Sequence, residues 1–297
     1  MLEQVTRPMA ETPANASGPG RIDALLPPET ALACEAAGAT KAARDGVTLV
    51  VLGVLAGAFI ALGAIFMTVV LTGSATLPWG VGRLLGGTAF SLGLILVIVG
   101  GAELFTGDSL MVVAWASRRI TATALMRAWA LVYLGNICGA LGTAALVFLA
   151  GQYGAAVGAV GKTALAVASA KAGLPTEQMF FLAVLCNVLV CLAVWMSFGA
   201  RSIGDKVLVI VPPVAAFVAA GFEHSIANMY LLPYALAVKA LAAPEFWLAI
   251  GQDASAYPAL TLANALRNIA VTTIGNLIGG SLLVGVVYWF VYLRRPS

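Results

Sequence analysis

Residues 221–229 read Gly-Phe-Glu-His-Ser-Ile-Ala-Asn-Met and interrupt an apolar stretch that otherwise runs from residue 207 to residue 238. Two ionisable side chains, Glu223 and His224, therefore fall in the middle of a segment long enough to cross a lipid bilayer. Such groups are tolerated at that depth where they face protein or water. The interruption, flanked by small residues, predicts unwound backbone that lines a cavity.

A second apolar stretch is interrupted in the same way. Residues 84–102 are uncharged, Glu103 and Asp108 follow, and an apolar segment resumes at 110–117. An unwound turn leaves backbone N–H groups free, and a neighbouring carboxylate can accept them. We therefore expect Glu103 and Glu223 to be structural residues at the two breaks. We expect Asp108 to cap the second half-helix, as Asp commonly does at helix starts.

The whole chain has the composition of a membrane protein. Of its 297 residues 61% are hydrophobic and only 10% are charged, whereas soluble domains carry roughly 25% charged residues. A bilayer core of about 30 Å needs about 20 apolar residues per helix, while strands of a membrane barrel are about 10 residues long and alternate. The uninterrupted stretches have helical length and lie at residues 47–71, 128–161, 179–200 and 268–293. The prediction is an all-α polytopic membrane protein of six transmembrane helices, with the second and fifth broken.

The basic residues predict the orientation of these spans. Nine Lys and Arg side chains flank the predicted spans on one side and five on the other. The positive-inside rule then places both termini in the cytoplasm, in a cytoplasmic (inner) membrane. Residues 1–44 contain no apolar segment typical of a cleaved signal peptide. We expect them to form a cytoplasmic segment with a disordered start of about 20 residues and a short interfacial helix, followed by a six-span transport domain at 45–297.

The two halves of the transport domain resemble each other. Residues 135–139 read Gly-Asn-Ile-Cys-Gly in the third span, and residues 275–279 read Gly-Asn-Leu-Ile-Gly in the sixth. Because each half has three spans, the halves, at about 45–161 and 177–297, have opposite orientations. Inverted repeats with paired broken helices place a transport site near the midplane, between the two breaks. The pattern thus indicates a channel or transporter.

The chemistry available at that site is limited. His224 is the only histidine of the chain, and its unperturbed pKa of ~6.5 lies near physiological pH. Thr106 offers a hydroxyl in the opposing break. The four cysteines have no metal-site spacing, so neither a metal nor a cofactor is expected. An enzyme would need a nucleophile with its base or a metal cluster, and a single His without such partners argues against one.

Several motifs resemble those of the formate/nitrite transporter family, and within it the formate channels. Besides residues 221–229, they are Glu-Leu-Phe-Thr-Gly at 103–107, Val-Cys-Leu-Ala-Val-Trp-Met-Ser at 190–197, Pro-Glu-Phe-Trp at 244–247 and Thr-Ile-Gly-Asn-Leu-Ile-Gly-Gly at 273–280. The resemblance covers about residues 22–295. It implies an aquaporin-like six-helix protomer, assembled as a homopentamer with one pore in each protomer. Gly107-Asp108 departs from the family pattern, which has small polar residues there.

The resemblance also implies roles for individual side chains. His224 and Thr106 resemble the central pore pair, and Lys171 resembles an outer lysine, in the loop before the fourth span, with Asn187 below it. The implied hydrophobic constrictions, of a kind that strips water from a solute, are Phe90, Leu94, Leu104 and Phe217.

The function implied is bidirectional passage of formate, with exchange of a proton at His224. The pattern is compatible with channel-like anion flow and with proton-coupled export. The same fold carrying nitrite, hydrosulfide or lactate is the alternative. A water or glycerol channel is disfavoured because neither break has the Asn-Pro-Ala turn that such channels use. The segment 1–44 is a candidate docking site for a cytosolic formate-producing enzyme such as pyruvate formate-lyase.

Overall fold

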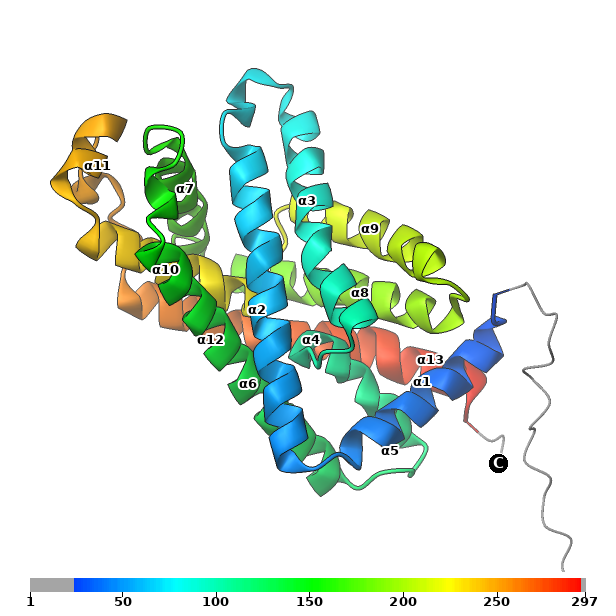
Figure 1. Cartoon of the computed structure of the whole chain (residues 1–297). Coiled ribbons are helices and arrows are strands. Elements are labelled where there is room, and N and C mark those ends of the chain that lie inside the picture. The colour runs from blue at the N-terminus through cyan, green and yellow to red at the C-terminus, as the bar shows by residue number, and fades with distance from the viewer. Residues whose placement is uncertain (1–23, 295–297) are drawn as a thin grey trace, which may run out of the picture.

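The computed structural model describes residues 24–294, so the expected disordered start lies outside the described residues. Within residues 24–294 all regular structure is helical (Figure 1). The α-helices are α1 (Pro27–Ala42), α2 (Gly46–Leu71), α3 (Trp79–Gly100), α4 (Phe105–Asp108), α5 (Val112–Ala116), α6 (Ala122–Leu149), α7 (Ala159–Ala172), α8 (Thr176–Gly199), α9 (Ile203–Ala219), α10 (Ser225–Leu241), α11 (Pro244–Ile250), α12 (Leu262–Ile278) and α13 (Val287–Tyr292).

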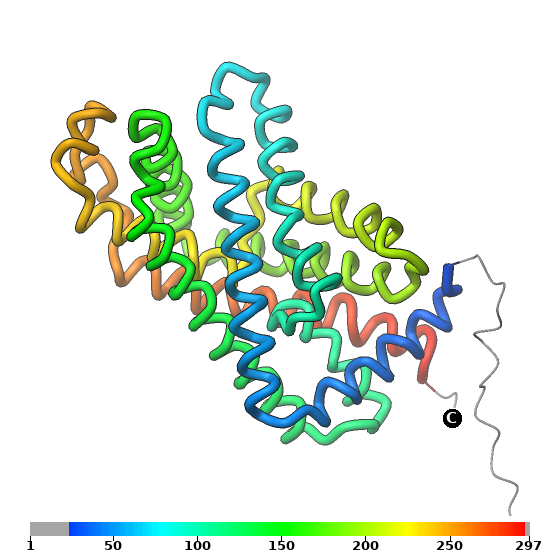
Figure 2. Tube along the Cα trace, viewed as in Figure 1, coloured from blue at the N-terminus to red at the C-terminus, as the bar shows by residue number. Residues whose placement is uncertain are grey.

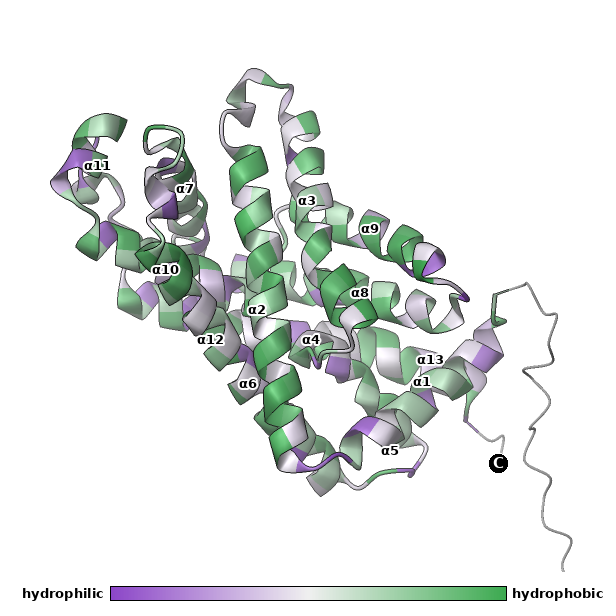
Figure 3. Cartoon of the chain, in the orientation of Figure 1, coloured by the Kyte–Doolittle hydropathy of each residue, from purple (hydrophilic) through white to green (hydrophobic). Residues whose placement is uncertain are grey.

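Five helices of the described part are long and apolar enough to cross a membrane. Four of them are α2, α3, α6 and α8, and the fifth is the continuous helix Leu262–Tyr292, in which a π-helical segment (Gly279–Val286) joins α12 to α13. A sixth is counted if α10 and α11, bent by 105° at their junction, are taken as one span. Figure 3 shows apolar residues along most of α2, α9 and α10. These are the elements of a polytopic membrane protein.

Both interrupted stretches end their first helix at a glycine in the left-handed region. The backbone φ is +80° at Gly101, after α3, and +77° at Gly221, after α9. Glycine adopts this conformation without the steric cost that a Cβ brings. In each case the chain runs extended for a few residues before the next helix, α4 or α10, begins.

One uncharged stretch is not a single helix. The sequence has no charge from residue 128 to residue 161, yet α6 ends at Leu149 and α7 begins at Ala159. Gly151 and Gly158, both with positive φ, turn the chain between them. The helix α7 carries Lys171 in its last turn, so this residue lies on a helix and not on the expected loop.

The repeated Gly-Asn motif brings helices into close contact. A Cβ placed at Gly139 of α6 would overlap the carbonyl oxygen of Val54 in α2, and one at Gly279 would overlap the carbonyl oxygen of Val184 in α8. Small residues let helix backbones approach in this way within membranes. Figure 2 shows α2 running beside α6 and α3, two elements that it contacts directly. The last glycine of each motif therefore joins equivalent helices in the two halves.

Candidate functional site

The two breaks are held by two asparagines in equivalent positions. The backbone N–H of Phe105 donates to Asn136 Oδ1 at 3.0 Å, and that of Ser225 donates to Asn276 Oδ1 at 2.9 Å. Both asparagines are fully buried. A buried backbone N–H left without an acceptor is costly, so each amide satisfies the donor that its break exposes.

The amide nitrogens of the same asparagines complete the arrangement. Asn136 Nδ2 donates to the carbonyls of Gly53, at 2.8 Å, and Glu103, at 3.0 Å. Asn276 Nδ2 donates to the carbonyls of Ala183, at 2.7 Å, and Glu223, at 2.9 Å. The sequence expectation that the Glu103 and Glu223 carboxylates accept the free backbone N–H groups is therefore wrong. The amides take that role because an amide can accept and donate at once.

The Glu103 carboxylate instead belongs to an ionic cluster with α1. Lys41 Nζ lies 2.7 Å from Glu103 Oε2 and 2.6 Å from Asp108 Oδ1, and Arg44 also contacts Glu103. Burial lowers the pKa of Lys41, but the Asp108 and Glu103 carboxylates raise it by more, so the net pKa lies above its usual range. The expected capping role of Asp108 is also wrong, because the helix restarts at Phe105 and Asp108 lies at its far end.

The Glu223 carboxylate has its own set of partners. Lys171 Nζ lies 2.8 Å from Oε1, while Asn228 Nδ2, at 2.7 Å, and Asn268 Nδ2, at 3.1 Å, donate to Oε2. The Lys171 side chain is only 18% exposed. Its charge is therefore paired with a carboxylate and not presented freely to solvent.

Between the two breaks lies the pair of Thr106 and His224. Thr106 Oγ1 is 3.0 Å from His224 Nε2, and both residues are buried. His224 also caps α10, because its Nδ1 accepts the backbone N–H of Ala227 at 3.1 Å. A ring nitrogen that accepts carries no proton, so the neutral ring holds its proton on Nε2 and donates it to Thr106 Oγ1. A second proton would have to go on Nδ1 and would break the bond to Ala227.

Two cavities lie near this pair: His224 lines the smaller one, and Leu104 and Gly107, which flank Thr106 in the chain, line the larger one. The smaller, of about 60 Å³, is lined by His224, Lys171, Phe90 and Phe217. The Phe217 ring stacks on the His224 ring at 5.9 Å between centroids, and Phe90 meets Phe217 edge-on at 5.8 Å.

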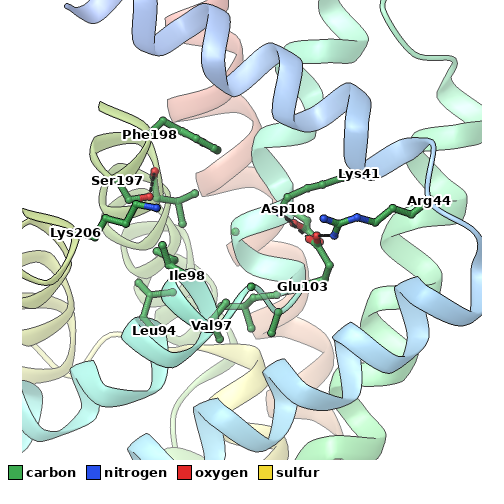
Figure 4. Close-up of a pocket in the computed structure, with 15 residues that line it drawn as sticks. Lys41, Arg44, Leu94, Val97, Ile98, Glu103, Asp108, Ser197, Phe198 and Lys206 are labelled. Atoms are coloured by element: carbon green, nitrogen blue, oxygen red, sulfur yellow. Dashed lines mark hydrogen bonds and ion pairs between the residues drawn. The ribbon is translucent and has the colours of Figure 1, made fainter. Parts of the chain in front are cut away.

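The larger cavity, of about 220 Å³, lies on the α1 side of the breaks. Leu94 and Leu104 are part of its wall. Figure 4 shows the cluster of Lys41, Arg44, Glu103 and Asp108 on one side of this cavity, facing Lys206 and Phe198 across it. The Lys206 side chain has no hydrogen bond or ion pair with any residue from 24 to 294.

Comparison with known proteins agrees with this architecture. The profile of the formate/nitrite transporter family matches residues 28–290. The chain belongs to the formate/nitrite transporter family. It is 45% identical over 275 residues to formate channel FocA of Escherichia coli (strain K12), an alignment that covers 92% of this chain and 96% of that one.

Two solved structures extend the likeness to three dimensions. One, described as a pentameric formate channel with formate bound, has a TM-score of 0.80 and 43% identity, and the match covers 84% of this chain and 98% of that chain. The other, an FNT family ion channel, has a TM-score of 0.75 and 30% identity, covering 90% and 99%. The prediction of an all-α polytopic membrane protein of this family is thereby confirmed. Its relatives are channels and transporters, and this family member is a transport protein and not an enzyme.

In this family member the last predicted site residue, Asn187, connects the first break to Asn276, the residue that holds the second break. Asn187 Nδ2, on α8, donates to the Thr106 carbonyl at 3.1 Å, to Ser109 Oγ at 3.2 Å and to the Asn276 carbonyl at 2.6 Å. Asn187 therefore contacts the centre of the fold and forms no hydrogen bond with Lys171. It contributes to the position of Thr106 through the backbone.

Some residues of the transporter site escaped the sequence prediction. Four asparagines, one lysine of α1 and the arginine just after α1 contact the breaks without having been predicted as site residues. The sequence did contain a signal for the asparagines, since a buried amide in an apolar span needs partners. The missed residues are Asn136, Asn228, Asn268, Asn276, Lys41 and Arg44.

Proposed function

We propose that the protein passes formate in both directions through a pore in each protomer of a homopentamer. The relatives named as formate channels and the likeness to a pentameric formate channel with formate bound support this substrate and assembly. The observation that carries the proposal is the Thr106–His224 pair, at 3.0 Å, together with the two cavities near it. In this proposal the six spans are aquaporin-like inverted repeats, with the second and fifth broken.

The proposed path runs from the cavity at Lys171, past the Phe90 and Phe217 rings, to Thr106 and His224. It continues past Leu94 and Leu104 into the larger cavity. A bare anion in an apolar constriction loses its hydration at a large cost. A donor at His224 Nε2 or Thr106 Oγ1 can replace part of that hydration by a charge-assisted hydrogen bond. An anion with an acceptor oxygen, such as a carboxylate, is therefore favoured over an anion without one.

Proton exchange at His224 carries a specific requirement. The neutral ring holds one proton, on Nε2. Giving that proton to formate would leave an anionic imidazolate unless Nδ1 took up a proton in the same process. Exchange thus requires that the Ala227 N–H bond break, at least transiently. The arrangement supports hydrogen bonding to the anion directly and proton transfer only with local opening of the first turn of α10.

We further propose a cytoplasmic membrane with both termini on the cytoplasmic side. The excess of Lys and Arg on the α1 side supports this orientation. Leu26, just before α1, and Leu32, in its second turn, are 58% and 54% exposed. These side chains support the proposal that the N-terminal segment docks a cytosolic formate-producing enzyme.

The decisive experiment is flux into proteoliposomes. Radiolabelled formate uptake is measured for the purified protein against empty liposomes, with nitrite, hydrosulfide and lactate as competitors. The proposal is supported if formate uptake is saturable and if nitrite or lactate competes with formate only weakly. No formate flux from a folded pentamer, or a preference for lactate, would overturn it.

A further inference from the structure

A basic pocket lies apart from the proposed pore, where the ends of α5 and α13 meet α1. It has a volume of about 840 Å³ and is lined by three arginines, Arg118, Arg119 and Arg294, together with Trp289, and by a single acidic residue, Glu35. α13 contacts both α1 and α5, which brings residues far apart in the sequence to one place (Figure 1). Counted at neutral pH, the lining carries an excess of two positive charges.

The guanidinium groups of this basic pocket are available. Arg118 and Arg119 are exposed, and their side chains form no hydrogen bond or ion pair within residues 24–294. The Arg294 guanidinium lies 3.6 Å from the centre of the Phe290 ring, and its N–H groups donate no hydrogen bond to the described part of the chain. Arginine binds phosphate through paired N–H groups, which gives strength and direction.

The pocket wall also holds polar atoms without partners. Ser117 Oγ and Trp289 Nε1 are buried and have no hydrogen bond in the described structure. A buried donor without an acceptor is unfavourable and requires an explanation. A ligand rich in acceptor oxygens, reached by a small rotation of these side chains, would supply the missing acceptor.

The position of the pocket relative to the membrane surface indicates which ligand it binds. Trp289 and Tyr292 lie in the last turns of the final spanning helix, and Arg294 follows two residues after its end, the order expected of an aromatic belt at the membrane surface. Phe290 and Val291, at 50% and 61% exposure, offer an apolar face beside it. A phosphate held by the arginines would therefore have room for its acyl chains along α13.

We propose that this basic pocket binds the headgroup of an acidic phospholipid of the cytoplasmic leaflet. Basic pockets between membrane helices on that side are suited to such headgroups, because the leaflet is rich in anionic lipid. The lipid would tie α1, α5 and α13 together at the membrane surface. The pocket shares no residue with the cavities of the proposed pore.

Arg118 provides a test that separates binding from folding. Its φ is +58°, and the bonds from its N–H to the Trp115 carbonyl and from Arg119 N–H to the Ala114 carbonyl close the end of α5. This is the helix-ending position that glycine usually takes. Arg118→Gly should therefore relieve backbone strain and leave thermal stability unchanged or raised, while it removes one guanidinium from the pocket.

The binding experiment uses the full-length protein in a nonionic detergent. Short-chain phosphatidylglycerol, phosphatidylcholine and inorganic phosphate are titrated separately, with bound ligand counted by native mass spectrometry. Each lost guanidinium should weaken phosphatidylglycerol binding about fivefold, first in Arg118→Gly and then in a variant that also carries Arg119→Gln and Arg294→Gln. The control is Lys162→Gln, an exposed basic residue of α7, which should bind as wild type does.

Three results would overturn the proposal. The first is that the wild type retains phosphatidylglycerol and phosphatidylcholine equally. The second is that the triple variant binds phosphatidylglycerol as the wild type does. The third is that inorganic phosphate binds as tightly as the lipid. The last would identify a free-anion site. Formate flux of the triple variant in neutral liposomes should equal that of the wild type, because the pocket is separate from the path.

Discussion

Lys41 of α1 forms ion pairs with two buried carboxylates at once. Replacing it by Met measures how much these ion pairs contribute to the free energy of unfolding. The Asp108 and Glu103 side chains are 2% and 3% exposed, and Lys41 is 26% exposed. After Lys41→Met, Glu103 keeps Arg44, but Asp108 loses its one ion-pair partner among the described residues. Methionine retains most of the aliphatic volume, so the change is mainly one of charge.

The expected loss follows from the asymmetry of buried ion pairs. Removing one partner of a fully buried pair costs about 3–5 kcal/mol, because the other charge is left uncompensated. Since Lys41 is partly exposed, we expect the lower end, about 3 kcal/mol. For a chain of this size that is a fall of about 6–12 °C in the unfolding temperature. Asp108→Asn should cost about 1 kcal/mol or less, because Lys41 keeps its contact with Glu103.

The double variant distinguishes a charge effect from a packing effect. Lys41→Met with Asp108→Asn removes the cation and the carboxylate that depends on it. With a coupling of about 2 kcal/mol, the double variant should lose about 2 kcal/mol and not the additive loss of about 4, and it should be more stable than Lys41→Met alone. Thermal unfolding is followed by tryptophan fluorescence in detergent at pH 7.5. Lys206→Met, in the wall of the same cavity, is the matched control and should unfold with the wild type. Additive losses in the double variant would refute the ion-pair argument.

The pH dependence of the same contact has a definite sign. The folded-state pKa of Lys41 is raised above its unfolded value of about 10.4. A raised lysine pKa contributes stability that is fully present below the unfolded value and is lost as pH rises through the folded value. The Lys41 contribution should therefore decline above about pH 10.4. A contribution that already declines between pH 7 and 9 would contradict this pairing.

Three further predictions concern the breaks and the proposed pore. His224→Asn should keep hydrogen bonding but lose any dependence of formate uptake on pH between about 5.5 and 7.5, and a folded variant with the wild-type pH profile would exclude proton exchange there. Asn136→Leu and Asn276→Leu should each cost about 3 kcal/mol in thermal unfolding, because each strands a buried N–H and two carbonyls; clearly unequal losses would contradict the equivalence of the breaks. Gly139→Ala should cost about 1–3 kcal/mol through overlap with α2, whereas Gly142→Ala on the same helix meets no atom within 4 Å and should be neutral or stabilising.

The sequence predicted the helix breaks because their signal is local. A charge inside an apolar stretch is readable without a partner, and Glu103 and Glu223 both lie where a helix has ended. The position where each helix restarts is not determined by a local signal. It depends on the amide of Asn136 or Asn276, which comes from another span and takes the first free N–H. For that reason the capping role expected of Asp108 was wrong by about one turn.

The partners of the carboxylates could not be predicted for a related reason. Lys41 and Asp108 are 67 residues apart, and Lys171 and Glu223 are 52 apart, so no periodicity links them. Yet both pairs follow one rule. A carboxylate placed beside an unwound turn cannot also be desolvated without a cation, and in each half the cation comes from a helix outside the broken span, α1 or α7. The cations of α1 and α7 thus offset the free-energy cost of burying a carboxylate beside each break. The central Thr106–His224 pair can then remain uncharged between the two ion pairs.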